Sequence, residues 1–211
     1  MTIVPQRHTA TILLAPLLLI TLWLSGCSVN PPKNVDNACA IFNEKRDWYR
    51  YSYQVEEKYG VAIPLQLAFI RQESGFLYNA RPPRQWLLGF IPWFRPSSAY
   101  GYAQIKDETW DWYRSKTSRY GDDRDHYGDA VNFIGWYVDV AHRNLKLAKD
   151  DVYNHYLAYH EGMGGYKQQS YRKKPWLEKV AKKVKTQSDR YREQLLGCED
   201  KLDKSLRWWP F

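Results

Sequence analysis

Residues 61–76 read VAIPLQLAFIRQESGF and place an acidic side chain at the end of a strongly apolar helix. Pro64 suits the first turn of a helix, where its missing N–H costs nothing, and the apolar run after it is typical of a helix buried on nearly all sides. Ser74 and Gly75 favour termination directly after Glu73. Burial there raises the pKa of a glutamate, so the stretch predicts a general acid that keeps its proton near neutral pH. A surface glutamate at a frayed helix end is the alternative.

The amino terminus has the pattern of an export signal. Arg7 precedes residues 12–24 (ILLAPLLLITLWL), which have the length of the apolar region of a signal peptide and are short for a membrane span. Residues 24–27 (LSGC) follow directly and resemble the bacterial lipobox, in which the cysteine is lipidated and becomes the first residue of the mature chain. An ordinary signal peptide cleaved nearby and an uncleaved anchor are the alternatives.

The lipobox resemblance implies a lipoprotein. Residues 1–26 would be removed as signal peptide, lipid on Cys27 would hold the chain at a membrane, and the polar residues 27–37 would form a tether. Ser28 follows the cysteine, where an aspartate would resemble an inner-membrane retention signal. This favours the outer membrane, with the protein facing the periplasm, over the inner membrane.

Two cysteines remain when Cys27 carries lipid. Cys39 lies at the start of the mature fold and Cys198 near its end, and an oxidising compartment favours a disulfide between them. Such a bond closes a loop of about 160 residues, which stabilises a fold by about 4–5 kcal/mol in the chain-entropy treatment.

The chain is basic, and this bears on its partners. Its 211 residues carry a formal net charge of +8, which becomes +7 without residues 1–26 because Arg7 is lost. Outside the cytoplasm this charge favours an anionic wall polymer or lipid headgroups as partners over nucleic acid.

The remaining pattern predicts a mainly α fold, with one domain at 38–198 and a tail at 199–211. No stretch alternates polar and apolar residues long enough to indicate a sheet. Apolar spacing, caps and breakers predict further helices at 38–59, from about 105, from a cap at Asp129 to about 147, at 152–160 and from Pro175, with a polar loop at 113–127.

Residues 81–98 (RPPRQWLLGFIPWFRPSS) combine four prolines with the most apolar composition of the mature chain. The prolines exclude a long regular element, and a loop this apolar must pack as a lid or face a partner or a membrane. A lid over one end of a groove is favoured, because the prolines supply the stiffness of a groove wall. A membrane-facing patch and a partner surface, including one for an envelope-assembly protein, remain alternatives.

Three short motifs occur together: Glu73-Ser74, GYAQI at 101–105 and AYHEG at 158–162. In this order and spacing they resemble the lytic transglycosylase domain of the lysozyme-like superfamily, over most of the mature chain. The resemblance implies a goose-type lysozyme (SLT) fold with a cleft, acting on peptidoglycan. Two departures stand out: Tyr102-Ala103 replace a Leu-Met pair, and His160 replaces an asparagine.

The resemblance also implies roles for individual residues. Glu73 would be the single catalytic acid, cleaving the MurNAc–GlcNAc β-1,4 bond with formation of a 1,6-anhydro end. Tyr159 would touch and orient its carboxyl group. The other substrate-binding candidates are Ser74, Gly101, Tyr102, Gln104, His160 and Glu161. Neither a cofactor nor a metal is expected.

Two alternatives to the lytic transglycosylase remain. One is a lysozyme-type muramidase on the same fold, in which water is the nucleophile and Glu161 or Asp107 assists. From the residues alone, Glu161 reads as a solvated loop acid. The other is a non-catalytic wall-binding or scaffold lipoprotein, weakened as an enzyme by the change at His160.

Overall fold

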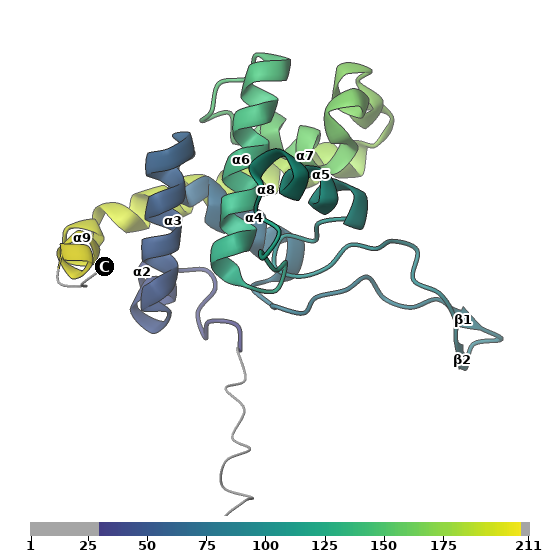
Figure 1. The fold of residues 1–211 in the computed structure, drawn as a ribbon, viewed down its shortest axis with the longest axis horizontal. Coiled ribbons are helices and arrows are strands. Elements are labelled where there is room, and N and C mark those ends of the chain that lie inside the picture. Colours follow the sequence, from purple (N-terminus) through teal and green to yellow (C-terminus); the bar gives the residue numbers. More distant parts are fainter. Residues whose placement is uncertain (1–29, 208–211) are drawn as a thin grey trace, which may run out of the picture.

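The computed structural model describes residues 30–207 and is mainly α-helical, as predicted (Figure 1). The predicted signal peptide and the lipobox with Cys27 lie outside the described residues. The elements, in chain order, are α2 (Ala38–Glu44), α3 (Arg46–Tyr59), α4 (Ile63–Ser74), β1 (Trp86–Leu87), β2 (Ile91–Pro92), α5 (Asp107–Thr117), α6 (Tyr127–Leu145), α7 (Val152–Lys167), the 3₁₀-helix η2 (Ser170–Lys173), α8 (Pro175–Leu196) and α9 (Glu199–Arg207). Within residues 30–207, no helix combines the length and the apolar character needed to cross a membrane.

Helix α4 is the centre of the fold. It packs against α8, α3 and α6, and every residue from Ile63 to Ile70 is buried. Pro64 lies in its first turn, and Gly75 ends it with a left-handed φ of 59°. Neighbouring helices on several sides therefore explain why α4 is apolar all round. The polar end of α4 lies where the chain turns.

Several helix boundaries differ from the predictions. Lys45, at φ −116° and ψ 72°, divides the predicted helix 38–59 into α2 and α3. Helix α5 extends to Thr117, into the predicted loop. Helix α6 begins at Tyr127, so Asp129 lies in its first turn and is not its cap. The Asp129 carboxylate instead accepts a hydrogen bond from the Asp123 backbone N–H in the preceding loop (3.1 Å).

The carboxyl-terminal part is also more helical than expected. Helix α7 continues past Gly162, whose non-helical backbone (φ 74°, ψ 159°) makes a kink there. The predicted tail contains α9, from which Leu202 is buried in the core and Asp203 accepts a hydrogen bond from Tyr49.

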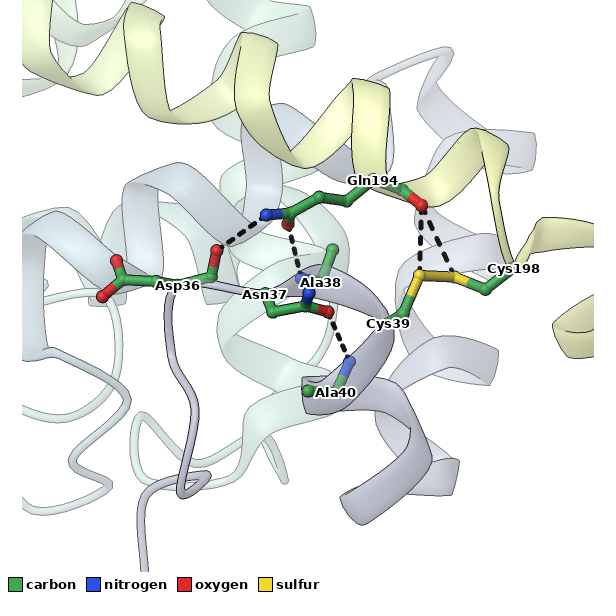
Figure 2. The surroundings of a disulfide bond; sticks show 7 residues. All are labelled: Asp36, Asn37, Ala38, Cys39, Ala40, Gln194 and Cys198. Carbon is green, nitrogen blue, oxygen red and sulfur yellow. Dashed lines mark hydrogen bonds between the residues drawn. A yellow bond between two sulfur atoms is a disulfide. The ribbon is translucent and has the colours of Figure 1, made fainter.

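The predicted disulfide joins Cys39 of α2 to Cys198, just after α8, with a Cα–Cα distance of 6.1 Å (Figure 2). The side chain of Gln194 lies beside it, accepting from Ala38 N–H (2.8 Å) and donating to the Asp36 carbonyl (3.0 Å). The two ends of the domain are thus fastened by a covalent bond and by hydrogen bonds.

The predicted tether is only partly a tether. Pro32 is already buried, and Lys33 N–H donates to Glu44 (2.9 Å). Asp36 accepts from Arg71 Nε at 2.9 Å, and the Tyr191 hydroxyl donates to the Val35 carbonyl. From Pro32 onward the segment packs on the helical body, because its polar groups find partners there.

The lid prediction for residues 81–98 is wrong. The segment forms a hairpin arm that leaves the helical body and ends far from it (Figure 1). Trp86 is 58% and Trp93 53% exposed, and neither lines the cleft described below. Near the root of the arm, Ser97 and the adjoining Ala99 do border the cleft.

Candidate active site

A cleft of about 470 Å³ gathers residues from four parts of the chain. They are Glu73 at the end of α4; the segment that leads into α5 and its first turn, with Ser97, Ala99, Gln104, Ile105, Lys106, Glu108 and Thr109; Phe133 and Tyr137 of α6; and Tyr159, His160, Glu161 and Gly162 of α7. The three sequence motifs therefore meet at one place.

Glu73 lies in the last turn of α4, with part of its surface open to the cleft. The rings of Tyr156 and Tyr159 each stand edge-on to Phe69, one turn earlier on α4, with centroids 5.3 Å away. These aromatic groups remove water from the carboxyl group, and the burial raises the pKa of Glu73 to about 7. Burial therefore favours the protonated form of the carboxyl group, which is the form that a general acid needs.

The hydrogen bond to this carboxyl group comes from Tyr156, not from the expected Tyr159. The Tyr156 hydroxyl donates to Glu73 Oε1 at 2.9 Å, and burial together with the nearby carboxylate raises the pKa of Tyr156, so that it stays a donor. Tyr159 donates instead to the Ala103 carbonyl at 2.6 Å. It thereby ties α7 to the GYAQI segment. Helical spacing was the signal for Tyr156, since residues three apart share a helix face.

We expect Tyr156→Phe to reduce turnover about three- to tenfold, the effect of one ordinary hydrogen bond. The bond lowers the pKa of Glu73, so its loss moves the alkaline limb of the pH–rate profile to higher pH. Tyr159→Phe is the matched control and should leave that limb in place, because its hydroxyl does not bond Glu73. Equal shifts in both variants, or none in Tyr156→Phe, would contradict this assignment.

Within the GYAQI segment, Gln104 and Ile105 line the cleft, whereas Gly101, Tyr102 and Ala103 do not. The amide nitrogen of Gln104 donates to the carbonyls of Ala80 (2.8 Å) and Gly101 (3.0 Å). Gly101 has φ +78°, and a Cβ there would lie 2.0 Å from the Arg124 carbonyl oxygen. The requirement for glycine is therefore a close backbone approach.

Three predicted substrate ligands do not line the cleft. Tyr102 is 1% exposed and packs edge-on against Trp48 and Tyr127 in the core. Gly101 lies against the backbone carbonyl of Arg124, as described above. The Ser74 hydroxyl donates back to the Ile70 carbonyl of its own helix at 3.2 Å. Gln104, Tyr159, His160 and Glu161 do line the cleft, so their predicted contacts with substrate remain predictions.

Glu161 is a paired anion and not the solvated loop acid expected from the sequence. Its side chain is 4% exposed, and Lys174 Nζ lies 2.7 Å and His160 Nδ1 3.1 Å from Oε1. Ser170 donates to the other oxygen. Burial raises the pKa of Glu161, but the hydrogen bonds from Lys174, Ser170 and His160 outweigh it and lower the pKa to about 2. Glu161 therefore has no proton to give near neutral pH.

The remaining acids near the cleft differ in position. Asp107 pairs with Arg124 (2.7 Å) and does not line the cleft. Glu108, the next residue, does line it and is exposed. Glu108 lies in the first turn of α5, where an acidic side chain favours a helix start, and no sequence motif identified it as a residue of the cleft.

The comparisons agree with this geometry. A family model described as transglycosylase SLT domain matches residues 15–198. Neither the curated proteins nor the solved structures searched gave a match. The match spans the whole cleft and most of the chain. The chain therefore belongs to the transglycosylase SLT domain family and is a lysozyme-like, peptidoglycan-acting transglycosylase domain.

Proposed function

We propose that the chain is a lytic transglycosylase that cleaves the MurNAc–GlcNAc β-1,4 bond of peptidoglycan and leaves 1,6-anhydro-MurNAc ends. The observation that carries this proposal is Glu73, a desolvated carboxyl group with a pKa near 7 that opens into the cleft. A pKa near the working pH suits a group that must give a proton and later accept one.

The reaction then needs one carboxyl group in two steps. Protonated Glu73 donates its proton to the glycosidic oxygen, and the bond between that oxygen and the anomeric carbon of MurNAc breaks. The resulting Glu73 carboxylate accepts the proton of the 6-hydroxyl of the same MurNAc, whose oxygen bonds the anomeric carbon. No water enters, because the internal hydroxyl is held beside the reacting carbon. The enzyme ends with Glu73 protonated.

Gln104 is suited to position the sugar. Its amide nitrogen donates to the carbonyls of Ala80 and Gly101. The amide oxygen is therefore left to accept a hydrogen bond from a substrate N–H, such as that of an acetamido group. Phe133 and Tyr137 supply aromatic surface to the cleft, a surface on which a sugar ring can pack.

A hydrolytic muramidase is the second candidate, and Glu108 is the observation that favours it. A hydrolase needs a second carboxylate to activate water or to stabilise the sugar, and Glu108 borders the same cleft. Glu161 and Asp107, the assistants expected from the sequence, are held in ion pairs.

The masses of the products distinguish these candidates. Digestion of purified peptidoglycan should release fragments lighter by one water than the hydrolysed fragments that a muramidase yields. Hydrolysed ends alone would select the muramidase. Binding to the wall without turnover would select the scaffold.

We also propose that Cys27 carries lipid and that the protein faces the periplasm from the outer membrane. The support is the LSGC sequence directly after an apolar segment. Labelled palmitate should enter the wild-type chain and not Cys27→Ser, and membrane fractionation should place the label in the outer membrane. Equal labelling of both chains would contradict lipidation at this residue.

A further inference from the structure

We propose that the hairpin arm, residues 81–98, is a membrane-binding element that inserts its tip into an anionic lipid surface. At the tip, β1 and β2 pair Trp86 with Pro92 and Leu87 with Ile91. All residues from 83 to 94 are exposed. No other exposed segment among residues 30–207 is so continuously apolar.

The side chains of the arm are ordered along its length. Leu88 and Phe90, 75% and 70% exposed, flank Gly89 at the very tip. Leu87 and Ile91 come next, then Trp86 and Trp93, and Arg84 and Arg95 lie nearer the body. Apolar groups, then tryptophans, then cations is the order in which a protein crosses from hydrocarbon through the interface to the headgroups.

The charge of the arm favours a lipid surface over a protein partner. Residues 81–98 contain three arginines and no carboxylate, and cationic side chains beside apolar ones add attraction to anionic headgroups. The tip is also a narrow protrusion (Figure 1). A bilayer accommodates such a shape, whereas a typical protein interface buries about 800 Å² per partner over a broader surface.

The root of the arm is fixed to the cleft. The Ala80 carbonyl accepts from Gly101 N–H at 3.0 Å and from the Gln104 side chain at 2.8 Å. Arg95 donates to the Pro82 carbonyl, and the Arg81 guanidinium lies 4.1 Å from the centroid of the Tyr100 ring. Insertion of the tip would therefore set the orientation of the cleft relative to the membrane.

The amino terminus would keep the body near the membrane. Pro32 is packed on the body, and the five chain steps from Cys27 to Pro32 span at most about 18 Å. Lipid on Cys27 would therefore hold this part of the body within about 18 Å of the bilayer surface. This step rests on the lipidation proposed above, but the following test does not.

The test uses a chain from Ser28 to Phe211, without lipid. The core side chains of the described part lie between Ala38 and Leu202, and the disulfide lies within that range, so this chain retains the folded body. It should float with phosphatidylglycerol-containing vesicles and bind phosphatidylcholine vesicles more weakly. The double variant Leu88→Asp/Phe90→Asp should lose at least about tenfold in the vesicle partition coefficient.

Control variants distinguish vesicle binding by the arm from nonspecific adsorption of the protein to lipid. Leu196→Asp changes a 78% exposed leucine on α8 and should bind vesicles like the wild type. Brominated lipid should quench wild-type fluorescence more than that of Trp86→Phe/Trp93→Phe, which keeps the arm apolar but removes its indoles. Absence of vesicle binding by the wild type, or equal binding by the arm variant, would overturn the proposal.

A separate measurement tests whether the hairpin arm binds substrate. On soluble glycan strands without vesicles, Leu88→Asp/Phe90→Asp should keep the wild-type rate. A rate that falls with the vesicle affinity would assign the arm to the substrate and overturn the membrane proposal. Vesicle binding requires no turnover, so an inactive enzyme with a membrane-binding arm would contradict only the proposed function.

Discussion

Glu73→Gln should lower the turnover of peptidoglycan about 10²–10⁴-fold, the usual contribution of a general acid–base group. Glutamine keeps the size of the side chain and can still accept from Tyr156, but it has no proton to transfer. In the wild type, turnover should fall as the pH rises through about 7, where Glu73 loses its proton. Initial rates on purified peptidoglycan between pH 5 and about 9 measure both effects.

Glu108→Gln is the matched control, because it makes the same chemical change in an exposed acid of the same cleft. It should keep near-normal turnover. Glu161→Gln should also retain the acid step, though it breaks the pairing with Lys174. Near-normal activity of Glu73→Gln, together with inactive Glu108→Gln or Glu161→Gln, would assign the reaction to another acid.

Glu73→Gln should also change how the free energy of unfolding depends on pH. The pKa of Glu73 is raised from 4.5 to about 7 in the folded state, so its contribution to stability is complete below pH 4.5 and is lost as the pH rises through 7. Glutamine does not titrate. Glu73→Gln should therefore gain roughly 1–3 kcal/mol in unfolding free energy relative to wild type between pH 4 and pH 8. Urea unfolding of both proteins at each pH measures this gain. If the difference in unfolding free energy between variant and wild type is the same at both pH values, Glu73 is not a buried carboxyl group with a raised pKa.

Cys39→Ser/Cys198→Ser should lower the free energy of unfolding by about 4–5 kcal/mol. The bond links residues 159 apart, and its loss lets the unfolded chain sample many more conformations. The Gln194 side chain accepts a hydrogen bond from Ala38 N–H and donates one to the Asp36 carbonyl, and these bonds keep the ends adjacent in the folded state. The variant should therefore fold to the same structure with a lower denaturant midpoint.

The wild type treated with a reducing agent is the control for this prediction. Reduction should lower its midpoint to that of the double variant and should leave the variant unchanged. Two reactive thiols at these positions in the unfolded, unreduced wild type would show that the bond does not form. An equal midpoint with and without the bond would show that it does not stabilise the fold.

The sequence was most informative where local chemistry determines structure. Pro64 and Gly75 define the ends of α4 through their own backbone preferences, and the apolar run between them has one physical solution, burial. This is why the position and the protonation of Glu73 could be predicted. Cys39 and Cys198 were the cysteines left after the lipobox, so their pairing followed as well.

Predictions failed where the answer depended on distant residues. Glu161 forms an ion pair with Lys174 and accepts a hydrogen bond from Ser170, and these residues reach it because the chain folds back through η2. Tyr156 and Tyr159 share a helix, and only the position of α4 decides which of them meets Glu73. The arm is a related case, because an apolar loop must find an apolar environment but its sequence does not say whether its own chain provides one.

Digestion in ¹⁸O-labelled water tests the central claim most directly. If the 6-hydroxyl of MurNAc is the nucleophile, the new ends form from atoms already in the sugar. The account therefore predicts anhydro fragments free of ¹⁸O in the mass spectrum of the wild-type products. Hydrolysed fragments, heavier by one water and carrying ¹⁸O at the new reducing end, in place of anhydro fragments would contradict it, because a hydrolysed end takes its oxygen from solvent and an anhydro end has no hydroxyl there to exchange.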